Sequence, residues 1–251
     1  MSKSKNTLSN TLGLLLRFSI GFLFSPLVFG ADWSEIAMRL SGGSESEKAS
    51  MIKKLKEIPQ LESTLRASLL GDKKFLALDV ISALKLSSFL PTLLELSEQD
   101  ESGFFYHAIN SLVTHDNRIK IVQLYKTRLF QATISPSAKI ALIDTLARLQ
   151  ASLTESQLKC LLSDSQFEVR SSALHYMRYW ILQLGQWDII SLLSLVLQKK
   201  TPFQLKLQGL YLISEVPPRY RRSILPFLNH CKSESNLLVK ELCSKLQSGH
   251  I

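Results

Sequence analysis

The sequence has few residues that break regular structure and few that build disulfide frameworks. Its 251 residues include 10 glycines, 8 prolines and 3 cysteines. It also lacks alternating runs rich in Val or Ile between turn residues, which are the pattern of half-buried strands. These absences exclude a β-rich fold and a disulfide scaffold. Leucine and serine are abundant instead, and the 45% hydrophobic content is enough to bury a sizeable core, so we predict an all-α fold.

Sequence motifs of catalysis and metal binding are absent as well. The five histidines show no His-x-x-His or His-Glu-x-x-His spacing, and no Cys-x-x-Cys occurs, so the pattern gives no zinc site. Ser41-Gly-Gly-Ser44 lacks the lysine and strand context of a phosphate loop, and Gly-x-Ser-x-Gly is missing. We therefore expect a protein that is not an enzyme, with no metal and no cofactor. A catalytic site assembled from distant residues is the alternative.

The clearest helix signal runs from Asp164 to Met177. Val169, Ala173, Leu174 and Met177 have the spacing of one apolar helix face. Asp164 suits an N-cap, because a carboxylate there can accept hydrogen bonds from unpaired backbone N–H groups. Ala173 is small and would let another helix approach closely.

This segment resembles the first helix of a HEAT repeat, in which a short acidic turn precedes Val-Arg and then Ala-Leu. Val169-Arg170 and Ala173-Leu174 carry the resemblance. It implies an α–α superhelix, a HEAT-like solenoid of about six helix pairs over residues 31–251. In such repeats the acidic start and the arginine commonly serve packing, so Asp164 and Arg170 are expected to hold the stack, with ligand contact as the alternative role. Large apolar residues equivalent to Met177 recur at intervals of 28 to 36 residues, at Leu55, Leu84, Leu112, Leu146, Ile213 and Leu246.

Local start signals place several helices. Ser44 with Glu47 and Thr154 with Gln157 have the spacing of capping boxes. Ser135-Pro136 and Thr201-Pro202 each offer a hydroxyl cap followed by proline at the first helical position. We also predict helices over 31–40, 61–70 and 119–130, and a terminal helix over 233–246 that would cap the array. No linker is long enough to indicate a second domain.

Residues 1–30 differ from the rest of the chain. Lys3, Lys5 and Arg17 precede a 12-residue apolar run over 18–29, and Val28 and Gly30 provide the small-residue exit of a signal peptide, with cleavage before Ala31 or one residue later. The run is shorter than the ~20 residues that span a bilayer. We predict export, to the periplasm or outside in a bacterium. The alternative is an uncleaved anchor. We expect contact with a membrane only through such an anchor.

The net charge and the cysteines give little information about the function. The chain carries +9, of which three positive charges lie in residues 1–30, and residues 151–251 hold 12 basic against 7 acidic residues. This bias favours acidic partner surfaces, although a solubilising surface explains it as well. Cys160, Cys231 and Cys243 lie among apolar residues and are predicted to be small buried core residues; a disulfide between Cys231 and Cys243 is the alternative.

Aromatic residues surround a long turn after the helix that contains Val169. Tyr179, Trp180 and Trp187 either fill the core there or form, together with Arg178, a contact site for a partner protein.

A second candidate binding site is the basic run Arg219, Tyr220, Arg221 and Arg222. Three arginines at a helix start oppose the helix dipole, and guanidinium groups bind carboxylates and phosphates bidentately. The run either contacts an acidic partner or forms a solvated basic face. If it contacts a partner, changing all three arginines to Ser should weaken capture of that partner and leave helical circular dichroism and melting unchanged.

The expected function is non-catalytic binding of a protein or peptide on the surface lined by one helix of each pair. The alternative is a HEAT-like DNA-binding protein or DNA glycosylase of the alkylation-repair type, which the Arg219–Arg222 run and the tryptophans could imitate. Asp188 would then be the only candidate catalytic aspartate. Export argues against nucleic acid as the partner, and salt-dependent duplex binding would discriminate. A bilin-lyase-like HEAT enzyme or a chaperone is a third option, but no residues specify a pigment site.

Overall fold

The computed structural model describes residues 33–181, 186–198, 200–216, 228–229 and 234–248. All regular elements within these residues are helical, which confirms the all-α prediction. The helices are α2 (Trp33–Gly42), α3 (Glu45–Lys56), α4 (Leu61–Ser68), α5 (Lys74–Leu84), the short 3₁₀ helix η1 (Ser87–Phe89), α6 (Leu90–Gln99), α7 (Phe104–Ser111), α8 (His115–Leu129), α9 (Pro136–Arg148), α10 (Glu155–Leu162), α11 (Phe167–Trp180), α12 (Gln186–Val196), α13 (Phe203–Glu215) and α15 (Leu237–Ser248). The predicted signal peptide lies outside the described residues.

Three of the predicted helix starts are confirmed. Glu47 accepts a hydrogen bond from the Ser44 N–H at 2.7 Å and donates its own N–H to Ser44 Oγ at 3.4 Å, which completes a capping box. Thr154 and Gln157 form the same reciprocal pair at the start of α10. Ser135 Oγ accepts the Ala138 N–H at 3.1 Å at the start of α9.

Two other helix starts differ from the prediction. The N-cap of α13 is Pro202 and has no side-chain cap bond, while the Thr201 hydroxyl lies 3.4 Å from the Leu195 carbonyl oxygen. The predicted cap at Thr201 is therefore wrong, because the hydroxyl has a partner in the preceding helix. Helix α8 begins at His115, four residues before the predicted Ile119, since Thr114 and Asn117 form a further capping box.

The chain divides into two compact units, Met1–Thr64 and Leu65–Ile251. In the first unit α2 packs against α3. The apolar side chains of α2 are buried, as its periodicity predicts: Trp33, Ile36, Ala37 and Leu40.

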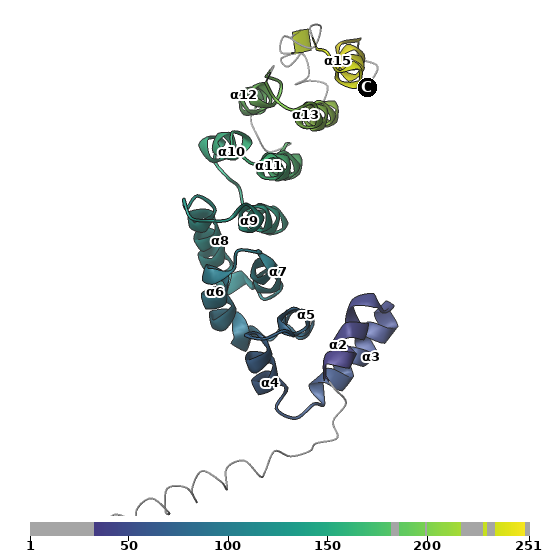
Figure 1. The fold of residues 1–251 in the computed structure, drawn as a ribbon, viewed down its shortest axis with the longest axis vertical. Coiled ribbons are helices and arrows are strands. Elements are labelled where there is room, and N and C mark those ends of the chain that lie inside the picture. Colours follow the sequence, from purple (N-terminus) through teal and green to yellow (C-terminus); the bar gives the residue numbers. More distant parts are fainter. Residues whose placement is uncertain (1–32, 182–185, 199, 217–227, 230–233, 249–251) are drawn as a thin grey trace, which may run out of the picture. The chain divides into compact units, whose positions relative to one another are not determined.

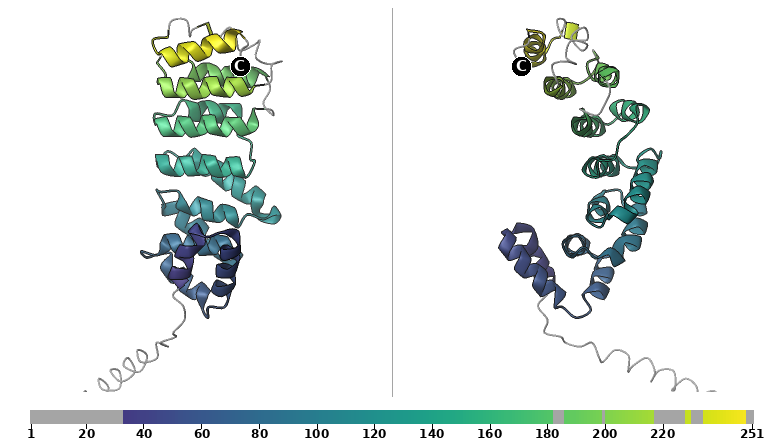
Figure 2. Two further views of the ribbon diagram at one scale, coloured as in Figure 1. Left: turned by 90° about the vertical axis from the view of Figure 1, so that its right-hand side faces the viewer. Right: turned by 180° about the vertical axis from the view of Figure 1, so that it is seen from behind.

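The helices of the second unit lie in two rows (Figures 1 and 2). In the odd row α5, α7, α9, α11, α13 and α15 pack in this order, each against the next. In the even row lie α6, α8, α10 and α12, and each of them packs on the odd-row helix that follows it in the chain. Most of the apolar residues used to align the sequence fall in consecutive odd-row helices, and Leu112, Leu146, Met177, Ile213 and Leu246 are buried.

Buried tyrosines help to join the helices of the second unit. Tyr106 of α7 and Tyr125 of α8 meet edge to face, with ring centroids 5.3 Å apart. Arg128 places its guanidinium 5.4 Å from the centre of the Tyr106 ring and donates to the Ser97 carbonyl of α6. Burial raises the pKa of the Tyr106 hydroxyl to about 12. These contacts link α6, α7 and α8 into a continuous core.

Candidate binding surface

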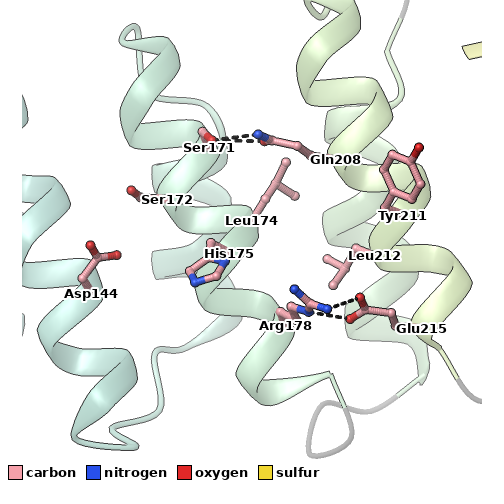
Figure 3. A pocket seen from close by; sticks show the side chains of 10 residues that line it. All are labelled: Asp144, Ser171, Ser172, Leu174, His175, Arg178, Gln208, Tyr211, Leu212 and Glu215. Atoms are coloured by element: carbon pink, nitrogen blue, oxygen red, sulfur yellow. Dashed lines mark hydrogen bonds and ion pairs between the residues drawn. The ribbon is translucent and has the colours of Figure 1, made fainter. Parts of the chain in front are cut away.

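One groove of the second unit crosses three consecutive odd-row helices. It has a volume of about 620 Å³ and is lined by residues of α9, α11 and α13 only (Figure 3). We call it the α9–α13 groove. Its lining residues are Asp144, Ser171, Ser172, Leu174, His175, Arg178, Gln208, Tyr211, Leu212 and Glu215.

Two cross-helix contacts bridge α11 and α13 in this groove (Figure 3). The Gln208 side-chain amide donates a hydrogen bond from Nε2 to Ser171 Oγ at 3.0 Å. Arg178 makes a two-point ion pair with Glu215, from Nε to Oε2 at 2.8 Å and from Nη2 to Oε1 at 2.6 Å. Because the contacts are seven residues apart on each helix, they stand about 10 Å from one another. The side chains of Leu174 and Leu212 lie between them, and both residues are buried.

On the other side of α11 the groove contains an aspartate and a histidine. Asp144 projects from α9 on the side of α11, and His175 projects from α11 on the side of α9 (Figure 3). His175 is exposed and meets the Tyr179 ring edge to face at 5.6 Å. Within the described residues, the Asp144 carboxylate has no hydrogen-bond or ion-pair partner.

A second groove, of about 340 Å³, lies between α5 and α7 and is again lined only by the odd row. This α5–α7 groove also combines an aspartate of one helix, Asp79, with a histidine of the next, His107. Phe75 and Phe104 meet at its edge with centroids 4.7 Å apart, although they are 45% and 50% exposed. Burial raises the pKa of the Asp79 carboxyl above its ordinary value. We call the side of the odd row that carries both grooves the open face.

The structure separates the four residues of the predicted aromatic contact site. Arg178 lines the α9–α13 groove, and Tyr179 is 57% exposed beside His175, so Tyr179 does not fill the core. Trp180 is half-buried against Tyr176, at a centroid distance of 6.3 Å, and its indole N–H is buried without a partner among the described residues. Trp187 belongs to α12, but its side chain lies outside the described residues.

The predicted N-cap role of Asp164 is wrong. Gln166 is the N-cap of α11 and has no side-chain cap bond. Asp164 instead accepts hydrogen bonds from Lys139 Nζ of α9 at 2.7 Å and from the Gln166 N–H at 2.9 Å. Burial alone would raise the pKa of its carboxyl, but the Lys139 and Gln166 hydrogen bonds and the nearby positive charges of Lys139 and Arg170 hold that pKa below its usual value. Its carboxylate therefore bridges α9 to the connector before α11.

The other predicted repeat positions also make contacts within the protein. Arg170 Nη1 donates to the backbone carbonyls of Asp164 at 2.6 Å and Ser165 at 3.1 Å. Val169, Ala173 and Leu174 are buried. Both Asp164 and Arg170 thus bond neighbouring parts of the chain.

The second candidate site, Arg219, Tyr220, Arg221 and Arg222, lies outside the described residues, as does the side chain of Asp188. Of the cysteines, Cys160 is free and exposed, so the prediction that it is buried is wrong. Leu158, Leu161 and Leu162 form the buried face of α10, and Cys160 points away from it. Cys243 is buried and disulfide-bonded, while Cys231, its proposed partner, lies outside the described residues.

The groove residues Asp79, His107, Asp144, His175 and Tyr211 were missed because the sequence was aligned on its apolar positions. The same alignment contains a signal for them. Asp79 and His107 each stand five positions before the aligned apolar residue of their helix, and Asp144, His175 and Tyr211 each stand two positions before it. Polar residues at equal offsets on packed helices lie in neighbouring places on one face.

Comparison with known proteins gives no relative. A scan of protein families, a search of curated proteins and a search of solved structures each find no match to this chain. In the part of the chain that the structure describes, no group of three or more His, Cys, Asp or Glu residues could hold a metal ion. No helix in that part has the length and apolar character needed to cross a membrane.

Proposed function

We propose that this chain is an exported, non-catalytic HEAT-like solenoid that binds a protein or peptide on its open face. The regular packing of each odd-row helix on the next supports the solenoid. Repeat arrays of this kind bind through many side chains on one continuous surface, so no short motif is required.

The observation that carries the proposal is the exposure of aromatic side chains at both grooves. Tyr211 is 60% exposed, and Phe75 and Phe104 pair with each other while remaining about half exposed. Apolar surface that gathers around a groove with a polar rim is typical of interaction sites. The ion pair and the Ser171–Gln208 contact fix the shape of the larger groove before a partner arrives, which reduces the entropy lost on binding.

Two observations support export. The basic start, short apolar run and small-residue exit of residues 1–30 have the order of a secretory signal. The disulfide at Cys243 suits an oxidising compartment, where such bonds persist.

Nucleic acid is a poor fit to the open face. Asp79 and Asp144 line its grooves without a basic partner among the described residues, and carboxylates repel the phosphates that dominate binding to DNA. We therefore assign the open face to a protein partner.

The proposal is tested by capture from an envelope extract of the source organism, with each captured protein identified and then rebound in purified form. Changing His175 and Tyr211 together to Ser should abolish rebinding. The matched control changes His115 and Ile119 to Ser, which removes a histidine and an 84% exposed apolar residue from α8 of the even row. Equal rebinding by both variants would contradict the assignment of the open face.

A further inference from the structure

The two grooves carry a local charge opposite to that of the whole chain. Their charged side chains are Asp79, Asp144, Glu215 and Arg178, that is, three acidic and one basic, or −2 with the histidines neutral. The complete chain carries +9. Because Arg178 and Glu215 neutralise each other in a two-point ion pair, the net charge resides on Asp79 and Asp144.

Each of these two carboxylates could pair with a cation, and the described residues do not supply one. Neither has a hydrogen-bond or ion-pair partner among them. Burial raises the pKa of Asp79, and no cation in the described part of the chain offsets this cost. Asp79 is exposed overall and its carboxylate is only partly desolvated, so a positive group entering the groove could pair with it directly.

A ring lies near each carboxylate. Phe104 lines the α5–α7 groove with Asp79. In the α9–α13 groove His175 of α11 is the ring on the side of Asp144, while Tyr211 lies on α13 at the other end of the groove (Figure 3). Lysine and arginine side chains pack their aliphatic stems on apolar surface and place their cations near ring faces. Carboxylates with exposed rings therefore suit a basic side chain better than an acidic or purely apolar one.

We propose that the open face binds a positively charged segment of its partner protein, with one basic side chain near Asp79 and another near Asp144. This inference rests on the proposed function and names the chemistry of the partner. Helices α5 and α9 are two packing steps apart in the odd row, so the carboxylates are separated by about 16 to 20 Å. An extended chain advances about 3.3 Å per residue, and the two basic residues are therefore about five or six positions apart.

The test uses a display library of random 12-residue peptides, selected on the full chain in low salt. We expect the selected peptides to be enriched in Lys and Arg relative to the starting library. The double variant with Asp79→Asn and Asp144→Asn should bind these peptides about tenfold more weakly, the scale of two lost surface ion pairs. Raising the salt concentration should weaken binding to the unmodified chain and have little effect on the variant.

The matched control carries Glu95→Gln and Asp116→Asn, which remove two exposed acids from the even row and change the net charge equally. It should bind as the unmodified chain does, which excludes an effect of overall charge. Circular dichroism and melting of all variants should agree. Equal weakening in both double variants would overturn the proposal.

Failure of this inference is distinguishable from failure of the proposed function. If the selected peptides are neutral or acidic, and they bind the unmodified chain but not the variant with His175 and Tyr211 changed to Ser, the charge assignment is overturned. The open face then remains the binding surface. Peptides that bind independently of His175, Tyr211, Asp79 and Asp144, or no selection above background, would count against both.

Discussion

At the scale of single residues, tyrosine and arginine side chains join neighbouring helices through backbone groups. The Tyr176 hydroxyl donates to the Ala151 carbonyl and accepts the Leu153 N–H at 2.8 Å. Arg118 of α8 donates to the Leu149 carbonyl at 2.6 Å. Each bond satisfies a peptide group that a helix end or connector leaves unpaired. Long side chains therefore complete the hydrogen bonding of the connectors.

Tyr176→Phe should lower the free energy of unfolding by about 1 to 3 kcal/mol. The change leaves a buried N–H and a buried carbonyl without their partner, which costs more than one average hydrogen bond. Urea unfolding followed by circular dichroism measures the loss. Tyr179→Phe is the control, because that hydroxyl is on a side chain that is mostly exposed. An equal effect of the two changes would contradict the role of Tyr176.

The ion pair between Lys206 and Glu234 should make stability depend on pH. The hydrogen bond from Lys206 is the main cause that holds the pKa of the Glu234 carboxyl below 4.5, with burial acting in the opposite direction. A carboxyl whose pKa is lowered by folding stabilises the protein above its unfolded-state pKa. That contribution is present above about pH 4.5 and is lost as the pH falls through the folded-state pKa.

Glu234→Gln should therefore destabilise the protein by roughly 2 to 3 kcal/mol at pH 7, because the charge-assisted hydrogen bond from the buried Lys206 ammonium to the Glu234 carboxylate is lost. The difference from the unmodified chain should shrink below pH 4.5. Melting curves across pH 3 to 7 measure both effects. Glu241→Gln on α15 is the control, since its pair with Lys245 is exposed and should contribute nothing measurable. A constant difference at all pH values would contradict the pairing.

At the scale of elements, the sequence predicted the helix starts that depend only on neighbouring residues. Ser44, Ser135 and Thr154 cap their helices because their partners lie three residues away. Asp164 is not the cap because α11 begins only at Phe167, and the carboxylate also pairs with Lys139, which is 25 residues earlier and comes close only in the folded chain. The apolar neighbours of Cys160 predicted burial, but these leucines form one face of α10 and Cys160 lies off that face.

Gly103 controls the approach of α7 to α9. It has φ +81°, and a Cβ atom there would stand 2.5 Å from Ala141 Cβ. Gly103→Ala should cost about 2 to 4 kcal/mol from left-handed backbone strain and overpacking together. The control is Gly71→Ala, where the nearest atom to the new methyl group is 3.9 Å away. Thermal unfolding compares the two, and similar melting temperatures would contradict the account.

At the scale of the whole molecule, the scarcity of Gly and Pro and the lack of alternating Val- or Ile-rich runs predicted the all-α fold, and most of the recurring large apolar residues fall in odd-row helices. Neither pattern could predict the grooves, because their shape depends on contacts such as Arg178 with Glu215, 37 residues apart. Nor did the net charge of +9 indicate that the groove linings are acidic, since charge totals carry no information about placement.

The central claim is that the open face binds another protein. The most direct measurement places a photo-crosslinking phenylalanine analogue at position 104 or 211 of the chain in its own cells, and at position 119 of α8 as the control. Irradiation should join the same partner protein to the chain from positions 104 and 211 and not from position 119. Adducts of equal yield from all three positions, or adducts from position 119 alone, would contradict the claim.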